Sequence, residues 1–108
     1  MKINAIEVNP EKKTADVWDA VTETEIKNSA DTDVSAHLKT YILNEKGSAV
    51  GKTETDFTVK AGGVTLIVQT VLTYSPVLGE PLYKVVCELY ENNALTDKQE
   101  KPLTFKVL

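Results

Sequence analysis

The chain has 108 residues, of which 42% are hydrophobic and 26% charged, and its formal net charge of −4 at pH 7 fits one folded globular domain and excludes a disordered chain. All 12 basic residues are lysines scattered along the sequence, so nucleic-acid binding is not expected. No apolar run approaches the ~20 residues that cross a bilayer, and the N-terminal MKINAIEVNP lacks the apolar core of a signal peptide, so neither a membrane span nor a targeting segment is expected.

The first half of the chain alternates between apolar and polar residues, as half-buried antiparallel strands do. Its expected strands are residues 3–8, 16–27, 33–43 and 48–59. In TETEIKN, the face expected to be buried consists of Thr22, Thr24 and Ile26, and the face expected in solvent carries Glu23 and Glu25. In VSAHLKTYI, the same rule places on one face Val34, Ala36, Leu38 and Ile42.

The second half continues the alternation with a higher apolar content. Its expected strands are residues 63–73, 82–91 and 94–107, and a break within the last of them, as within 16–27, stays open. In GVTLIVQTVLT, one face carries Val64, Leu66, Val68 and Leu72, and in LYKVVCELY one face carries Tyr83, Val85, Cys87 and Leu89. Near the end the pattern returns at Leu103, Phe105 and Val107. We expect the apolar faces of these strands to press together between two sheets.

Turn residues separate the expected strands. Three of these turns, Asn44–Gly47, Ala61–Gly63 and Asn92–Asn93, contain Gly, Asn or both, and these residues adopt the left-handed backbone region readily. Residues 28–33 and 73–81 form two further loops, and prolines near both ends keep the second loop out of a central ladder. Short strands with a turn every ten residues or so predict an all-β fold, namely an antiparallel β-sandwich of about seven strands with Greek-key connections.

A family resemblance rests on three segments: TETEIKN, LKTYILNEKGSAVGKTETDFTVKAGG and YSPVLGEPLYKVVCEL. They resemble the immunoglobulin-like β-sandwich domain of glycoside hydrolase family 2, the group of β-galactosidases, β-glucuronidases and β-mannosidases. The resemblance covers about residues 14–107, and its most specific element is Ser75-Pro76 followed by Pro81-Leu82-Tyr83. The chain departs from the family pattern in having Tyr74 where a Trp is usual, and in lacking the Gly-Arg common before the catalytic barrel.

The resemblance implies that residues 1–108 form one immunoglobulin-like sandwich domain of a larger multidomain glycosidase. In such enzymes the catalytic Glu pair sits in a separate (β/α)₈ barrel, for which this chain has no match. The domain itself would carry no catalytic residue and no cofactor. Its partners would be the catalytic barrel and another sandwich domain of the same polypeptide. The sugar cleaved by the parent and its compartment stay open, a bacterial periplasmic or secreted location being one option.

Two pairs of carboxylates have a spacing that suggests catalytic acids. Glu23 and Glu25, at i and i+2 on a strand, have side chains roughly 6.5–7 Å apart on one face, near the separation found in inverting glycosidases. No apolar pocket that would keep one of them protonated is apparent, so a solvated charged face is the better interpretation. The same interpretation holds for Glu54 and Asp56.

His37 and Cys87 are the only His and Cys of the chain. His37 falls on the outward face of its strand, and the sequence shows no third group that would form a triad with His37 and Ser35. Cys87 is expected to be a buried small hydrophobe, and a lone Cys forms no intrachain disulfide. One His and one Cys cannot build a zinc site, and DTD at residues 31–33 lacks the Gly and the later Glu of a calcium loop, so no metal is expected.

Trp18 and Tyr74 are the two candidate contact residues. Each could anchor a neighbouring domain or offer a stacking platform to a sugar, and an anchor at the edge of the core or between domains is the better interpretation, because a large aromatic contributes most when desolvated. Two functions stay open beside the accessory domain, since a sandwich hosts many roles. One is a structural or adhesive module of a surface or secreted protein, and the other is a carbohydrate-binding module.

Overall fold

The computed structural model describes residues 1–106 and contains seven strands, with no helix among these residues. The strands are β1 (Lys2–Lys12), β2 (Val17–Lys27), β3 (Val34–Leu43), β4 (Ala49–Val59), β5 (Val64–Tyr74), β6 (Tyr83–Glu91) and β7 (Ala94–Leu103). The seven expected strands are confirmed, but β1 runs on to Lys12 and β7 ends at Leu103. Val107, expected in the last strand, lies outside the described residues. Residues 1–106 also include no helix with the length and apolar character needed to cross a membrane.

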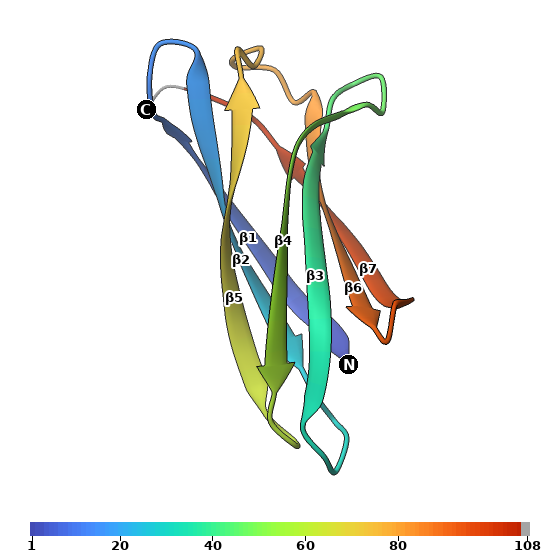
Figure 1. Cartoon of the computed structure of the whole chain (residues 1–108). Helices are drawn as coiled ribbons and strands as arrows, with labels where there is room; N and C mark the ends of the chain where they lie inside the picture. Colours follow the sequence, from blue (N-terminus) through green and yellow to red (C-terminus); the bar gives the residue numbers. More distant parts are fainter. Residues whose placement is uncertain (107–108) are drawn as a thin grey trace.

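The strands form two sheets that pack face to face (Figure 1). Sheet 1 has the order β1–β2–β5 and sheet 2 the order β4–β3–β6–β7, and all neighbouring strands are antiparallel. The pairs β1–β2, β3–β4 and β6–β7 are consecutive neighbours within a sheet, whereas the β2–β3, β4–β5 and β5–β6 connections cross from one sheet to the other. This is the antiparallel β-sandwich expected from the sequence.

The first strand was expected to end at residue 8, which is wrong, because β1 continues through Pro10 to Lys12. A proline cannot donate to a ladder, so it argues against continuing a strand. β1 is, however, an edge strand of sheet 1, with β2 as its only neighbour in that sheet. Pro10 is therefore accommodated there, in register with Ala20.

The core lies between the inner faces of the two sheets. In β2 every second side chain from Trp18 to Ile26 is buried, which confirms the alternation expected for this strand. The expected inner faces of β3 and β6 are buried in the same way, except that Val34 at the start of β3 is half-buried. Removing apolar surface from water contributes ~25 cal/mol per Å² and is the main stabilising term. The buried hydrophobic side chains of the cluster include Ile3, Trp18, Ile26, Leu38, Ile42, Val59, Val71, Val85, Leu89, Leu103 and Phe105.

β5 turns its more apolar face outward, contrary to the expectation that such faces meet in the core. The outward side chains, which are 39–58% exposed, are Val64, Leu66, Val68 and Leu72. The buried face of β5 consists of Ile67, Gln69, Val71 and Thr73. Paired residues of neighbouring strands lie on the same face of a sheet, so the buried Thr24 and Ala20 of β2 place their partners Ile67 and Val71 inward.

A buried polar network joins the two sheets through Gln69. Its Nε2 donates to the carbonyl oxygen of Leu38 at 3.2 Å and to Oγ1 of Thr55 at 3.0 Å. Its Oε1 accepts a hydrogen bond from the Thr40 hydroxyl at 2.6 Å, and that hydroxyl lies 3.5 Å from Sγ of Cys87. Buried polar groups need partners, so β5 can place a glutamine in the core because β3 and β4 supply them.

The turns use the residues expected from the sequence. At the β6–β7 hairpin, Asn92 and Asn93 both have positive φ angles, of 51° and 62°. At the β3–β4 hairpin, Gly47 has a φ of 77°, and Oδ1 of Asn44 accepts two backbone N–H groups of the turn at 3.0 Å each. Asn and Gly tolerate these angles better than other residues, which confirms both expected hairpins.

Asn28, the last residue of the TETEIKN segment, ties two loops together. It is 1% exposed. Its Nδ2 donates to the carbonyl oxygens of Thr32 at 2.9 Å and of Val59 at 3.0 Å, with that of Lys60 at 3.3 Å. Its Oδ1 accepts the backbone N–H of Ala30 at 3.0 Å. One amide side chain therefore satisfies four backbone groups at the end of the sandwich where β2 leaves sheet 1.

The segment after β7 stays in the core although the strand ends at Leu103. Phe105 is fully buried, and its ring meets those of Trp18 and Tyr83 edge-on, with centroids 5.9 and 5.0 Å apart. Its carbonyl oxygen accepts the N–H of Gly79 at 2.7 Å. The expected strand stops early because this segment pairs with the β5–β6 loop instead of continuing alongside β6.

β4 and β5 lie at the edges of different sheets and approach each other closely at Gly51. A Cβ at this position would overlap the carbonyl oxygen of Leu72 and come within 2.9 Å of Cγ1 of Val71. Glycine is required here because any side chain would separate the two strands.

Candidate functional site

His37 lies between two carboxylates on the outer face of sheet 2. The β3–β4 register places it opposite Asp56, and Glu54 lies two residues before Asp56 on the same face of β4. Its Nδ1 is 2.7 Å from Oδ1 of Asp56 and its Nε2 is 3.0 Å from Oε1 of Glu54. Both nitrogens donate only in the imidazolium form, so the geometry suits a charged His. The sequence predicted an exposed His, but it did not reveal these partners.

The two carboxylates shift the protonation of the imidazole. The hydrogen bond with Asp56 raises the pKa of His37 above its ordinary 6.5, and the bond with Glu54 adds to this shift. The same bond lowers the pKa of Glu54. Ser35, the nearby hydroxyl, is 3.0 Å from Oγ1 of Thr58 and makes no bond to His37. The two carboxylates therefore orient the ring of His37, but they occupy both of its nitrogens, and no hydroxyl among residues 1–106 is hydrogen-bonded to the ring to be activated as a nucleophile.

Replacing His37 by Gln should remove a pH-dependent part of the stability. Because the pKa of His37 is higher in the folded chain than its ordinary 6.5, its contribution is complete below that pH and is lost as the pH rises through the folded value. The pKa of Glu54 is lowered from 4.5, so its contribution is present above that pH and is lost as the pH falls.

We therefore expect the difference in melting temperature between wild type and His37→Gln to be largest between pH 4.5 and 6.5 and to shrink on either side. Thermal melts across this range measure it. Ser35→Ala, which removes a neighbouring hydrogen bond without a titrating group, is the control and should give a constant difference. A His37→Gln difference that does not change with pH would contradict the prediction.

A second polar cluster on this face surrounds Glu88. Its carboxylate accepts hydrogen bonds from the hydroxyls of Tyr41 at 2.9 Å and Tyr90 at 2.7 Å, and Nζ of Lys98 lies 3.9 Å away. Burial, with help from Glu88, raises the pKa of Tyr41 to about 12. Burial alone would raise the pKa of Glu88, but the hydroxyl bonds lower it overall. A carboxylate held ionised in this way is unsuited to act as a general acid.

The Glu23 and Glu25 pair lies on the outer face of β2, as expected. Both side chains are partly exposed on the sheet between β1 and β5. Glu23 stands opposite Glu7 on one side and Val68 on the other. A glycosidase pair needs two carboxylates facing each other across a bound sugar, whereas these two project side by side from one strand.

A hollow of about 520 Å³ lies between β1 and the end of β7. Its lining includes apolar side chains such as Val8 and Leu103, two lysines, and a single carboxylate, that of Glu11. It therefore lacks the pair of carboxylates that glycoside hydrolysis requires.

The two candidate contact residues, Trp18 and Tyr74, occupy different environments. Trp18 is 3% exposed and packs against Phe105, so its indole stabilises the core and has little surface left for a ligand. Tyr74 is 69% exposed at the end of β5. Of the two, Tyr74 is the side chain that another molecule or domain can reach.

The thiol of Cys87 is buried, as expected from the alternation of β6. Burial raises its pKa, which keeps it protonated and unreactive at neutral pH. Within residues 1–106, no three side chains of His, Cys, Asp or Glu gather in a way that could hold a metal ion.

The sequence matches the family model of glycosyl hydrolases family 2 over residues 1–106. Among similar solved structures are a β-glucuronidase from glycoside hydrolase family 2 (26% identity, TM-score 0.86, 93% of this chain covered) and a family 2 member from Bacteroides cellulosilyticus DSM 14838 (18%, 0.88, 96%). A third is a β-glucuronidase from Bacteroides uniformis (18%, 0.87, 96%).

The chain spans only a small part of these solved proteins, namely 11%, 15% and 14% of their respective lengths. No curated protein gives a significant match.

Proposed function

The chain belongs to glycosyl hydrolases family 2, and from this premise we propose that it is a non-catalytic β-sandwich domain of a longer glycosidase. Its task is to hold the catalytic barrel and another sandwich domain of the same polypeptide in their relative positions. The observation that carries this proposal is the combination of a family match over residues 1–106 with a span of only 11–15% of the similar solved chains.

The chemistry of the described side chains supports a role without catalysis. The carboxylates of Glu23 and Glu25 lie side by side on one strand, and the His37 cluster contacts no nucleophile. The 520 Å³ hollow has one carboxylate in its lining. Each of these arrangements misses a component that hydrolysis of a glycosidic bond needs.

A carbohydrate-binding module is the second candidate, because Tyr74 is an exposed aromatic side chain. A sugar ring could stack on its face. Titrating the chain with galactosides, mannosides and β-glucans, with Tyr74→Ala as the comparison, tests this role. A heat of binding or NMR chemical-shift changes that disappear in Tyr74→Ala would support sugar binding. Titrations without either signal would refute it.

The purified 108-residue chain should hydrolyse no aryl β-galactoside, β-glucuronide or β-mannoside above the buffer rate. The longer polypeptide that carries the chain should hydrolyse at least one of them. Release of the aryl alcohol, followed by absorbance, measures both rates. Turnover by the isolated chain would overturn its non-catalytic role, and inactivity of the longer polypeptide on all three classes would count against a glycosidase parent.

A further inference from the structure

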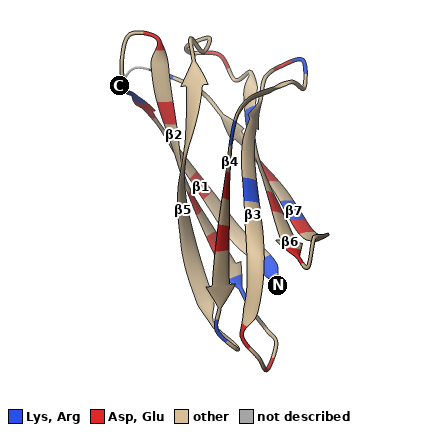
Figure 2. Ribbon diagram, in the orientation of Figure 1, with Lys and Arg blue, Asp and Glu red and all other residues tan. Residues whose placement is uncertain are grey.

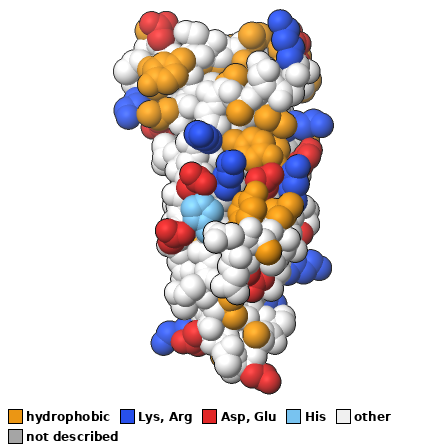
Figure 3. All heavy atoms as spheres, turned by 45° about the vertical axis from the view of Figure 1, so that its right-hand side comes forward, with side chains coloured by type: hydrophobic (Ala, Val, Ile, Leu, Met, Phe, Trp, Pro, Cys, Tyr) orange, Lys and Arg blue, Asp and Glu red, His pale blue; other side chains and the backbone are white. Residues whose placement is uncertain are grey.

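The two outer faces of the sandwich differ in how their charges are paired. On the outer side of sheet 2, acidic and basic side chains lie close to one another among apolar and uncharged ones (Figure 3). The ion pairs of this face are His37–Glu54, His37–Asp56, Lys84–Glu100 and Lys98–Glu88. Val86 is an apolar residue on this outer face, but it lies between Tyr41 and Glu100 and is fully buried, so it adds no exposed apolar surface. These four ion pairs neutralise part of the charge on this face, which suits contact with solvent.

The outer face of sheet 1 carries an apolar stripe along β5. This β5 stripe consists of Val64, Leu66, Val68, Leu72 and Tyr74. β5 has no charged residue and is the strand drawn without any blue or red in Figure 2. Single exposed apolar residues are ordinary, but five of the six outward positions of this strand are apolar, with Thr70 as the polar exception, and such a grouping marks an interaction site.

Beside the β5 stripe, β1 and β2 present carboxylates that face each other. Glu7 stands directly opposite Glu23, and Glu11 directly opposite Asp19. None of these four makes an ion pair with a cation among residues 1–106. Like charges directly opposite on a sheet are destabilising, so this arrangement costs stability in the isolated chain.

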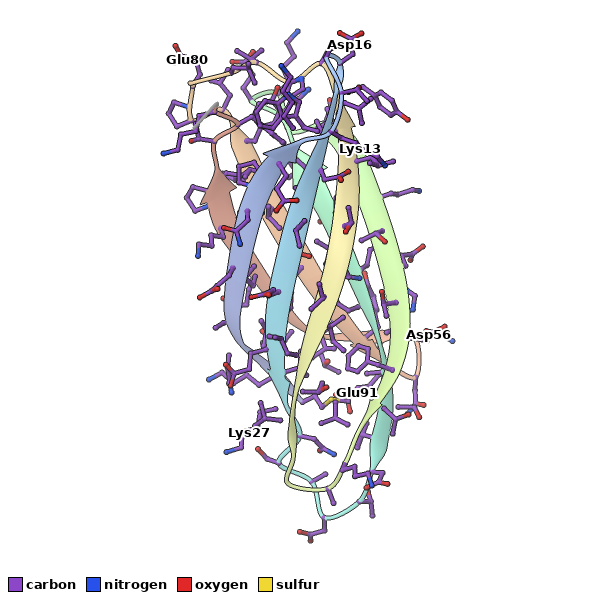
Figure 4. All side chains as sticks on the ribbon, turned by 90° about the vertical axis from the view of Figure 1, so that its left-hand side faces the viewer. Lys13, Asp16, Lys27, Asp56, Glu80 and Glu91 are labelled. Atoms are coloured by element: carbon purple, nitrogen blue, oxygen red, sulfur yellow. The ribbon has the colours of Figure 1, made fainter. Side chains whose placement is uncertain are left out.

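The lysines of this face do not relieve the repulsion. Lys2 and Lys27 lie opposite each other at one end, beside Val64, and leave the carboxylates in the middle without a partner. Figure 4 looks onto this face, with Lys27 labelled near its lower end. The face is therefore apolar over β5 and acidic over β1 and β2.

We propose that the outer face of sheet 1 is the docking surface for a neighbouring domain of the same polypeptide, whose surface carries apolar side chains over β5 and Lys or Arg side chains over β1 and β2. This inference rests on the proposed function. It names the face that makes the contact and the chemistry of the surface that covers it. Basic side chains placed against Glu7 and Glu23 turn a repulsion within the sheet into attractions across the interface.

Charge complementarity also argues against the other occupants of this face. A second copy of the chain, docked through the same face, would set its acidic half against either the acidic half or the apolar β5 stripe of the first. Both arrangements bury carboxylates without basic partners. A sugar would need aromatic platforms, and the β5 stripe is aliphatic except for Tyr74. A protein surface with apolar and basic side chains matches both halves of the face.

A cysteine placed in the stripe tests the contact directly. Thr70 is the exposed polar position between Val68 and Leu72, and the native Cys87 is buried, so Thr70→Cys adds the one thiol of this domain that reagents reach. In the longer polypeptide, we expect it to react with a maleimide at least about tenfold more slowly than in the isolated chain. Peptide mass spectrometry reads the modification of this position alone.

The matched control is Thr58→Cys. Thr58 is also an exposed threonine on a strand, but it lies on the outer face of sheet 2. Its reaction rate should be the same in the isolated chain and in the longer polypeptide. Equal rates for Thr70→Cys in the two contexts would overturn the proposal, as would protection in the isolated chain that grows with concentration, because that result assigns the face to self-association.

A second experiment tests the basic chemistry of the partner. Glu23→Gln removes the repulsion with Glu7, so we expect the melting temperature of the isolated chain to rise by about 2 °C. In the longer polypeptide the same change removes an attraction, so the cysteine at position 70 should become more reactive. Glu45→Gln, at the exposed tip of the β3–β4 hairpin, should change neither. If Glu23→Gln did not make the cysteine at position 70 more reactive in the longer polypeptide, the proposed basic side chains of the partner surface would be refuted.

The two proposals fail in different ways. A longer polypeptide that hydrolyses glycosides while Thr70→Cys stays fully reactive refutes docking through sheet 1 and leaves the accessory role standing. A longer polypeptide that protects Thr70→Cys but hydrolyses no glycoside supports the docking face and refutes the glycosidase parent.

Discussion

Replacing Gly51 by Ala should lower the free energy of unfolding by about 3 kcal/mol, because the added Cβ would overlap the carbonyl oxygen of Leu72. That neighbour is backbone of β5 and cannot rotate away, so β4 and β5 would have to separate. The strain would reach Val71, whose Cγ1 would lie 2.9 Å from the new atom. Urea unfolding, followed by the fluorescence of the single Trp, measures the change.

Two controls separate this effect from other consequences of replacing a residue. Lys52→Ala changes the next residue on β4, which is exposed, and should shift the stability by no more than about 0.5 kcal/mol. Gly47→Ala meets no atom within 4 Å but has a φ of +77°, so it should cost only about 1 kcal/mol of backbone strain. A Gly51→Ala variant as stable as the wild type would show that β4 and β5 do not approach as described.

Replacing Asn28 by Asp should destabilise the chain by about 3 kcal/mol at neutral pH. The substitution keeps the shape and the acceptor for the N–H of Ala30, but it places a buried carboxylate against the carbonyl oxygens of Thr32 and Val59. Burial and these oxygens favour the protonated acid, so its pKa in the folded chain is raised. The loss should therefore be present at neutral pH and shrink as the pH falls through that raised value.

Asn44→Asp is the matched control. Oδ1 of Asn44 accepts two backbone N–H groups at the exposed β3–β4 turn, and a carboxylate accepts them as well. We expect this variant to retain wild-type stability to within about 0.5 kcal/mol. If Asn28→Asp were equally harmless, the amide of Asn28 would not be holding the two loops. Denaturant unfolding at several pH values provides both comparisons.

The strands and hairpins were predictable from the sequence because they depend on local chemistry. Alternation predicted the inner faces of β2, β3 and β6, and these faces are buried as expected apart from the half-buried Val34. The positive φ angles of Asn92 and Asn93 follow from the tolerance of Asn for the left-handed region. The family resemblance is confirmed by the match over residues 1–106.

The orientation of β5 could not be obtained in the same way. Its outward face, with Val68 and Leu72, is more apolar than its inward face, which contains Gln69. Periodicity identifies the two faces of a strand. It does not determine which face packs into the core when both carry apolar residues, as they do in β5. The partners that make Gln69 acceptable in the core, such as Thr40 and Thr55, come from strands of the opposite sheet.

The His37 cluster was missed because it depends on cross-strand register. Asp56 and Glu54 are distant in sequence and meet His37 only when β3 and β4 are paired as observed. Counting back from the Asn44–Gly47 turn would have brought His37 and Asp56 near each other. The register also shifts between Ile42 and Leu43, and that irregularity is not visible in the sequence.

The order of strands in sheet 1 has a consequence for biosynthesis. β2 pairs with β5 rather than with a strand that directly follows it, so the edge of β2 stays open until β3, β4 and β5 have been made. At a translation speed of roughly 5–20 residues per second, this interval lasts several seconds. Such long-range pairings also place the domain among the slower folders, on the millisecond-to-second scale. The nascent chain is thus most prone to aggregate while β2 awaits its partner, and slower ribosomes would prolong that exposure.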